Sequence, residues 1–382
     1  MKRIHYLLAL GTFGIGTTEF GVIGILPQIA SAFAITIEKA GQLLSLFALI
    51  VAISGPFIML LISSLNKKIL MLFVLAIFGL SNIIAVFATN FNMLLTARLL
   101  PAFLHPVFWS IALSTAANNL PSEQSSKGVA IVFGGFTVSS VIGIPLATFM
   151  ASLFNWQSSF VLCAIINIIS FLGILFFLPS IKTTEKQTIS SQTKILKKPA
   201  LWISFILSFL IIAAMFSTYS FMAVFLNKVT KMNGVQISWM LLIFGLTGVA
   251  GNWLAGFMLS KSILNTAFVF IIALAAIHLL LYFYGLYYIP MLVLISIWGF
   301  VHTAGFLIGN INLTSSASES PEFVNSIFTT CGNAAVSCGT ILGGYFISCF
   351  SVQNVIWSSI SLLVLALLVW ILKRLGNFES IK

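Results

Sequence analysis

The sequence predicts an all-α membrane protein with twelve transmembrane helices in two six-helix bundles. Hydrophobic residues make up 60% of the 382 residues, and charged residues make up only 7%. The stretches between polar breaks are long enough to cross a bilayer as helices, which takes about 20 apolar residues. A membrane β-barrel would instead show alternating segments of about ten residues, and the sequence has no such alternation.

The predicted spans divide six and six around the longest polar stretch. They lie near residues 6–27, 41–63, 69–89, 92–116, 129–152, 159–178, 201–226, 237–259, 264–285, 288–310, 325–348 and 354–372. Residues 179–199 are then a cytoplasmic linker, which separates an N-terminal bundle at 1–178 from a C-terminal bundle with a short cytoplasmic tail at 200–382. Two bundles joined in this way suit alternating access, in which the halves rock about a site near the midplane.

The positive charges indicate topology rather than nucleic-acid binding. An even number of spans places both termini on one side, together with fourteen of the eighteen Lys and Arg residues. The positive-inside rule therefore places both termini in the cytoplasm. A nucleic-acid site would need these cations gathered on one folded face, whereas here they are scattered over short loops.

Glu19 is the only one of the seven acidic residues that falls inside a hydrophobic span. A carboxyl group there must be neutralised, paired or hydrated. Arg98 is its natural partner, because it is the only cation inside a span and lies at a similar depth. Two interpretations remain open at this point: a pair that loads and releases a proton, or a static ion pair that orders the bundle.

His105 and Trp109 follow Arg98 along the fourth span. In a continuous helix His105 lies two turns beyond Arg98 on the same face, and Trp109 lies one turn further. An imidazole titrates near physiological pH, so His105 joins Glu19 and Arg98 as a predicted proton-coupling residue. The alternative is a hydrogen bond from His105 to a carbonyl freed by Pro101 or Pro106.

Polar and aromatic residues inside the spans are the candidate solute contacts. They suit a neutral, partly polar solute, because aromatic faces and amides bind sugar-like or amphipathic ligands without a fixed charge. Some of them are instead expected to be interfacial anchors or helix-to-helix hydrogen bonds. The candidates are Thr17, Thr18, Trp109, Tyr219, Trp239, Asn252, Trp298, His302, Asn310 and Asn333.

Enzyme chemistry is not expected. The sequence has no Asp, and the HExxH, GxSxG and P-loop patterns are missing, so ATP is not the energy source and the proton gradient is expected instead. The four cysteines have neither CxxC spacing nor nearby His at ligand spacing, which favours a packing role, and no cofactor or metal is predicted. Helix packing and conformational roles are predicted for Pro101, Pro106, Gly143, Pro145, Lys67 and Lys68.

Several of these segments together resemble the drug:proton antiporter branch of the major facilitator superfamily, which includes bacterial sugar-efflux and arabinose-efflux-like permeases. The most specific are TTEFGVIGILPQIA (17–30), RLLPAFLHPVFWS (98–110) and GIPLATFMASLFNWQSSF (143–160). The resemblance implies export driven by proton influx, with Glu19 as the acid of span 1 and Arg98 as the arginine of span 4. It also implies a monomer in a bacterial inner membrane, small-molecule substrates and a role in drug resistance.

One segment departs from the pattern of that family. The loop between spans 2 and 3 normally carries an Asp, whereas SSLNKK keeps Lys67 and Lys68 without an acid. The sequence thus predicts a proton-coupled exporter of sugars or small amphipathic compounds, including drugs. The alternative is a facilitator or proton-coupled importer of a small neutral solute on the same fold, which does not need Glu19 to titrate.

Overall fold

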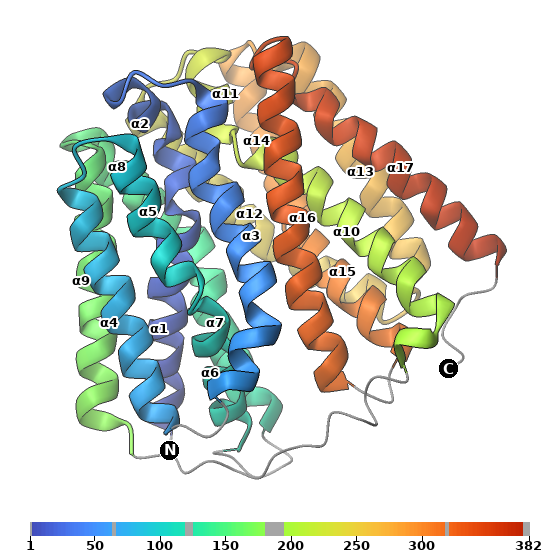
Figure 1. The fold of residues 1–382 in the computed structure, drawn as a ribbon. Coiled ribbons are helices and arrows are strands. Elements are labelled where there is room, and N and C mark those ends of the chain that lie inside the picture. The colour runs from blue at the N-terminus through green and yellow to red at the C-terminus, as the bar shows by residue number, and fades with distance from the viewer. Residues whose placement is uncertain (1, 63–65, 119–124, 180–194, 318–320, 377–382) are drawn as a thin grey trace. The chain divides into compact units, whose positions relative to one another are not determined.

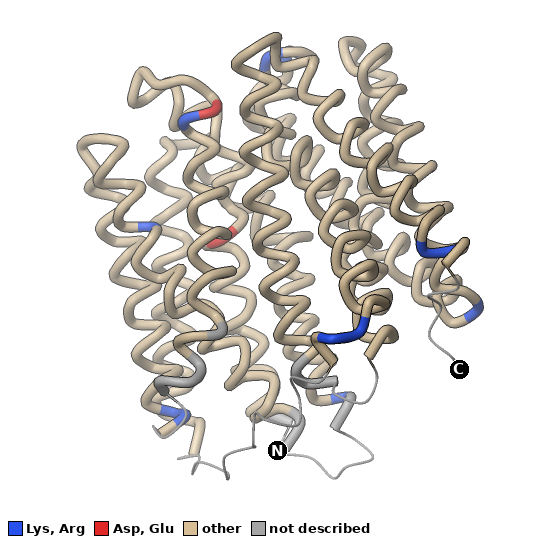
Figure 2. Tube along the Cα trace, turned by 45° about the vertical axis from the view of Figure 1, so that its right-hand side comes forward, with Lys and Arg blue, Asp and Glu red and all other residues tan. Residues whose placement is uncertain are grey.

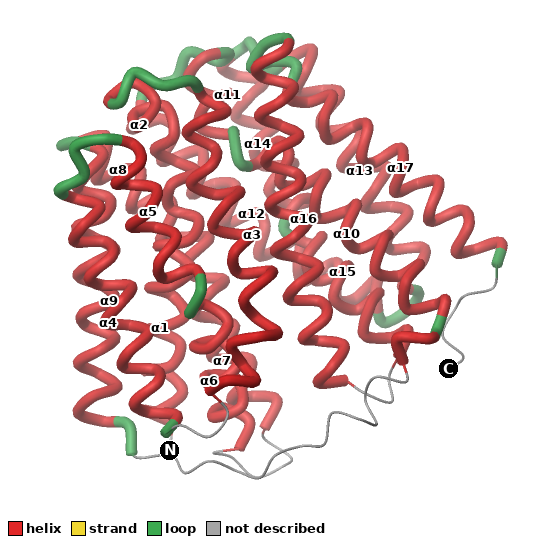
Figure 3. The backbone as a smooth tube through the Cα atoms, in the orientation of Figure 1, coloured by secondary structure: helices red, strands yellow, loops and turns green. Residues whose placement is uncertain are grey.

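The computed structural model describes residues 2–62, 66–118, 125–179, 195–317 and 321–376. Helices joined by short loops make up these residues (Figure 3). Eleven helical segments in this part of the chain are long and apolar enough to cross a membrane. A further long helix, α16 (Pro321–Cys349), covers the predicted eleventh span. The all-helical membrane fold predicted from the sequence is confirmed.

The first six spans contain more helical segments than spans. In chain order these are α1 (Lys2–Phe20), η1 (Gly21–Ile25), α2 (Leu26–Ala32), α3 (Ile37–Ile62), α4 (Lys67–Val86), α5 (Phe91–Ala102), α6 (His105–Asn118), α7 (Ser125–Val138), η3 (Ser139–Gly143), α8 (Ile144–Leu153) and α9 (Trp156–Phe177).

The last six spans show the same excess. They consist of α10 (Pro199–Tyr219), α11 (Met222–Lys228), α12 (Gly234–Leu259), α13 (Ile263–Tyr284), α14 (Tyr288–His302), α15 (Ala304–Thr314), η5 (Ser315–Ala317), α16 and α17 (Val355–Leu375).

The chain divides into two compact units. The first unit comprises Met1–Ile35, Ile53–Lys186 and Gly234–Leu242, and the second comprises Thr36–Ala52, Gln187–Asn233 and Ile243–Lys382. Within the first unit, α4 packs along α9 and α1 along α7, and within the second α10 packs along α16 and α17 (Figure 1). The division at a 179–199 linker stays a prediction, and most of that linker lies outside the described residues.

Spans 1, 4, 7 and 10 are each interrupted part-way. The interruptions fall after Phe20, at residues 103–104, at residues 220–221 and at Thr303. Pro101 and Pro106 flank the second of them, and proline removes a backbone donor from the helix. The continuous helix expected through Arg98, His105 and Trp109 is therefore wrong, because Arg98 lies on α5 and the other two lie on α6.

Span 5 is also irregular. A π-helical segment, Ser139–Gly143, precedes α8, and Pro145 occupies the first turn of α8. A Cβ on Gly143 would collide with Oγ1 of Thr17 on α1. In the second unit, a Cβ on Gly251 of α12 would collide with the backbone carbonyl of Phe300 on α14. Small residues allow helices to approach this closely in a membrane.

Lysines and arginines lie mainly at helix ends (Figure 2). Lys67 and Lys68 begin α4, where the side chain of Asn66 caps the helix by accepting from the backbone N–H groups of Lys68 and Ile69. The ammonium of Lys68 donates to the carbonyl of Leu175 at 2.9 Å. Asn66 thus satisfies helix-terminal donors in the loop where the family pattern places an acid.

Candidate functional site

Glu19 and His105 meet inside the first unit. Glu19 lies in the last turn of α1, His105 is the first residue of α6, and both are almost fully buried. Oε2 of Glu19 lies 3.0 Å from Nε2 of His105. Each residue stands beside an interruption of its own span, so the side chain of the last turn of α1 reaches the first turn of α6. The carboxyl group predicted from the sequence thus pairs with an imidazole.

Arg98 contacts Glu19 differently from the predicted side-chain pair. Its guanidinium donates to the backbone carbonyls of Thr18 at 3.0 Å and Glu19 at 3.1 Å, and it lies 5.9 Å from the ring centre of Phe160. These carbonyls belong to the last turn of α1, where no further helical N–H is available to them. A cation is also favourable at a helix C-terminus. Arg98 therefore places a fixed positive charge next to the acid while holding the end of α1.

Trp109 places an indole N–H donor at the same imidazole nitrogen. Its indole Nε1 lies 3.2 Å from Nε2 of His105, and its ring packs against Phe133 and Phe136. When Nε2 carries a proton it donates to the Glu19 carboxylate and cannot accept from Trp109. When Nε2 is bare it accepts from Trp109, and the short contact to Glu19 then requires the proton on the carboxyl group. The geometry thus places one proton between Glu19 and His105.

The sequence analysis missed a buried hydrogen-bond network around Thr18, the residue before Glu19. Oγ1 of Thr18 accepts from the amides of Asn82 at 3.2 Å and Asn167 at 3.0 Å, and it donates to the carbonyl of Gly14. Thr17 bonds the carbonyl of Phe13 within its own helix. Both threonines therefore hold α1 in position. A lone Asn in each of two apolar spans was the sequence feature that could have indicated this network.

Three of the predicted solute contacts come together in the second unit. The ring of Tyr219 lies 4.8 Å from that of His302 and stacks on Phe244 at 5.0 Å. Trp298 is edge-on to Phe244 at 5.5 Å and to His302 at 6.1 Å. We refer to Tyr219, Phe244, Trp298 and His302, together with His278, as the ring cluster. Its members lie on α10, α12, α13 and α14, and all are buried.

His278 is the member of the ring cluster that the sequence analysis did not select. It is fully buried on α13, its ring centre lies 5.5 Å from that of Trp298, and its Nε2 lies 3.2 Å from Oγ1 of Thr218. A single histidine inside the apolar stretch 264–285 was the available indication. Such a residue is costly in a membrane and is therefore a candidate for function.

The other predicted solute contacts have different surroundings. Trp239 is 55% exposed and belongs to the first unit. Asn310 donates to Asn325 at 3.2 Å, and Asn333 donates to a carbonyl of its own helix. Asn252 is half-buried, and its Oδ1 has no hydrogen-bond partner among the residues that the structure describes. These contacts do not connect the four residues to the ring cluster.

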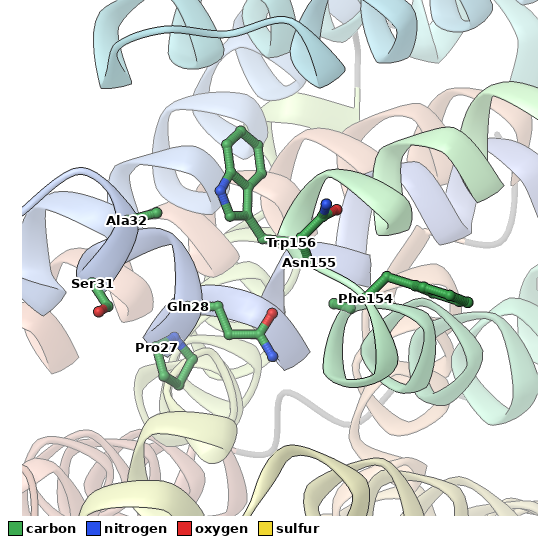
Figure 4. A pocket seen from close by; sticks show the side chains of 8 residues that line it. Pro27, Gln28, Ser31, Ala32, Phe154, Asn155 and Trp156 are labelled. Carbon is green, nitrogen blue, oxygen red and sulfur yellow. The ribbon is translucent and has the colours of Figure 1, made fainter.

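A surface pocket opens among the ends of α2, α8 and α9 in the first unit (Figure 4). Its volume is about 430 Å³, and its lining includes Gln28, Phe154, Asn155 and Trp156. Asn155 caps α9 by accepting from the backbone N–H of Ser158, and Trp156 packs against Phe33. The residues that line this pocket include neither Glu19 nor His105, so the pocket is separate from that pair.

The sequence profile of the Major Facilitator Superfamily matches residues 8–337. The chain belongs to this superfamily. Its curated relatives include the "Inner membrane transport protein YdhP" of Escherichia coli K12, which is 29% identical over 91% of this chain and 90% of that protein. They also include a "Probable sugar efflux transporter" of Helicobacter pylori P12, which is 27% identical over 90% of this chain and 88% of that protein.

A solved structure shows the same fold at much lower identity. A bacterial homologue of the human lysosomal transporter Spinster matches with a TM-score of 0.80 and 13% identity, over 98% of this chain and 97% of that one. The protein is thus a multi-pass membrane transporter of the superfamily and not an enzyme.

Proposed function

We propose that this transporter is a proton-coupled exporter of sugars or small amphipathic compounds, which works by alternating access. The observation that carries the proposal is the buried 3.0 Å contact between Glu19 and His105. Two titratable groups that share one proton inside a membrane are typical of proton relays, because ionisable residues are otherwise avoided there. Both groups lie at interruptions of their spans, where transporters place their coupling sites.

Arg98 sets the net charge of the cluster that it forms with Glu19 and His105. With Glu19 ionised and His105 neutral, the carboxylate balances the guanidinium and the cluster has no net charge. One added proton gives the cluster a charge of +1, which is costly in an apolar interior. The proton gradient supplies this proton from outside, and release toward the cytoplasm restores the neutral state. Solute binding that favours the neutral state couples export to proton entry.

The direction and the solute class draw on the relatives and on the chemistry of the second unit. The relative from Helicobacter pylori carries the name of a sugar efflux transporter. The ring cluster offers aromatic faces and neutral hydrogen-bonding groups, which suit an uncharged solute. We infer export of such a solute in exchange for protons, in place of import or facilitated diffusion.

The test is solute-driven proton movement in proteoliposomes that contain an internal pH dye, with a panel of sugars and hydrophobic compounds. We expect at least one panel member to drive proton movement through the wild type and not through Glu19→Gln. Glu38→Gln is the matched control, since Glu38 lies in the first turn of α3 and belongs to the second unit. Solute flux that survives Glu19→Gln without a proton signal contradicts coupling and supports a facilitator.

A further inference from the structure

Three polar atoms of the ring cluster have no hydrogen-bond partner among the described residues. They are Nδ1 of His278, Nδ1 of His302 and Nε1 of Trp298. The rings of both histidines neighbour the same indole, at 5.5 Å and 6.1 Å between centroids. The three side chains are between 0% and 3% exposed. A buried polar atom without a partner costs free energy, and three of them around one indole point to a guest that satisfies them.

The chemistry of these atoms defines the guest. The indole Nε1 can only donate, whereas each imidazole Nδ1 donates or accepts according to its tautomer. Hydroxyl groups match these atoms in either tautomer, because each hydroxyl both donates and accepts. A carboxylate matches them only where both Nδ1 atoms carry a proton, and an ammonium group cannot accept from the indole. The described contacts of the two histidines are with aromatic rings and the Thr218 hydroxyl, so a charged guest would lack a counter-charge.

The aromatic members favour a guest with an apolar face as well as hydroxyl groups. Tyr219 and Phe244 stack at 5.0 Å with an angle of 19° between their planes, beside His302. The stacked faces of these two rings cover one another, so the C–H side of a sugar ring would meet the outer side of the stack while its hydroxyl groups reach the polar edges. Neutral sugars have both properties, whereas purely apolar compounds leave the three nitrogens unsatisfied.

The ring cluster lies where span 10 is interrupted. His302 is the last residue of α14, and Thr303 separates it from α15. The hydroxyl of Thr303 donates to the carbonyl of Gly248 on α12 at 2.7 Å, which fixes the interruption against the neighbouring helix. Discontinuous helices near the bilayer midplane form binding sites in other transporters.

We propose that the ring cluster of the second unit is the binding site for a neutral, hydroxyl-bearing ring such as a sugar, with His278, Trp298 and His302 as its hydrogen-bonding residues. The assignment rests on the proposed transport of such a solute and adds which unit binds it. The buried histidines and indole meet the solute hydroxyls, and the outer side of the Tyr219–Phe244 stack meets the apolar side of the ring. Proton binding remains with Glu19 and His105 in the first unit.

The test is counterflow of radiolabelled glucose, arabinose, lactose and sucrose in proteoliposomes without a pH gradient, with gluconate as the charged comparison. Counterflow reports solute binding and exchange and needs no proton coupling. We expect wild-type counterflow for at least one of the four sugars and none for gluconate. Trp298→Phe and His302→Phe, which keep a ring and lose the polar atom, should lower it at least tenfold. His302→Asn should retain more of it, because its amide replaces Nδ1.

Control measurements distinguish loss of the sugar site from misfolding of a variant, and failure of the sugar site from failure of proton coupling. Trp357→Phe changes an exposed tryptophan of α17 that packs edge-on against Tyr282, and it should retain wild-type counterflow. The thermal unfolding of each variant is measured in detergent, and only variants that unfold close to the wild type are compared. Counterflow in the wild type without proton coupling contradicts the antiport proposal and leaves the sugar site in place. The sugar site is overturned if Trp298→Phe and His302→Phe both show wild-type counterflow. It is also overturned if the wild type exchanges none of the four sugars.

Discussion

Each of the two units contains a buried side-chain pair at an interrupted span, and the pair is charged in one unit and uncharged in the other. In the first unit, an acid at the end of α1 meets an imidazole at the interruption of span 4, next to the buried guanidinium of Arg98. In the second unit, a phenol at the end of α10 meets an imidazole at the interruption of span 10, and the neighbouring groups are aromatic. The same architecture therefore holds a charged pair in one unit and an uncharged pair in the other.

This difference indicates how a transporter separates two tasks. A proton needs a site that changes charge, and we propose that Glu19 with His105 is that site, beside the fixed cation of Arg98. A neutral solute needs shape, aromatic surfaces and hydrogen bonds, and we propose that the ring cluster offers them without a fixed charge. The following predictions test whether the charged centre and the uncharged centre depend on their surroundings in the expected ways.

The largest effect is expected from Arg98→Met. This change leaves the ionised Glu19 without its buried counter-charge and two terminal carbonyls of α1 without their donor. Breaking a buried pair by removing one partner costs about 3–5 kcal/mol. We expect a matching loss of stability in thermal or denaturant unfolding in detergent. Arg374→Met, at the exposed end of α17, is the control and should unfold near the wild type. Equal stability of the two variants contradicts the role of Arg98.

The uncharged centre should depend instead on the close packing of α12 and α14. In Gly251→Ala, the new methyl group meets the carbonyl of Phe300, and overpacking costs about 1–3 kcal/mol. Gly256→Ala is on the same helix and meets no atom within 4 Å, so it should be neutral or slightly stabilising. Unfolding of both variants in detergent measures the difference. If Gly251→Ala is as stable as Gly256→Ala, the two helices are less tightly packed than described.

Trp109→Phe tests the indole donor to the imidazole nitrogen of the first unit. The substitution keeps an aromatic ring against Phe133 and Phe136 and removes the N–H that donates to Nε2 of His105. A hydrogen bond contributes about 1 kcal/mol, so Trp109→Phe should lower the free energy of unfolding in detergent by about that amount. Trp253→Phe on α12, at a side chain that is 79% exposed, is the control and should unfold near the wild type. Equal stability of the two variants contradicts the hydrogen-bond assignment.

The smallest effect is expected at the interruption of span 10. Thr303→Val removes the hydrogen bond to Gly248 on the neighbouring helix and a second bond to Gly299 on its own helix. Thr137→Val removes only a bond within its own helix, to Phe133. Unfolding in detergent should show Thr303→Val to be less stable by about 0.5–1.5 kcal/mol than Thr137→Val. Equal stability means that the bond between helices does not hold the interruption.

The predictable features were those that depend on composition and on single residues. Long apolar stretches are sufficient for the all-helical membrane fold, because a bilayer admits few alternatives. Glu19 and Arg98 were recognisable because a charge inside a hydrophobic stretch is rare. His105 was selected as well, although from the geometry of a continuous helix, which the structure interrupts at residues 103–104.

The features that escaped prediction depend on packing between helices. The contact between Glu19 and His105 needs the interruption at residues 103–104, and only Pro101 and Pro106 indicated it in the sequence. The other interruptions include the one at Thr303, which has no nearby proline and is held by a hydroxyl bond to α12. His278 lies far in sequence from Trp298 and Thr218, so its role follows from their spatial proximity.

The central claim is that the first unit binds the proton and the second binds the solute. Calorimetric titration of a transported sugar, in two buffers that differ in ionisation enthalpy, gives both the Kd and the number of protons released per sugar bound. We predict that Glu19→Gln abolishes proton release and also raises the Kd, because Gln keeps the cluster in the charge state that solute binding disfavours. His302→Phe should raise the Kd at least tenfold without changing the number of protons that the remaining binding releases. Proton release that persists in Glu19→Gln, or that is lost in His302→Phe with an unchanged Kd, would contradict this account.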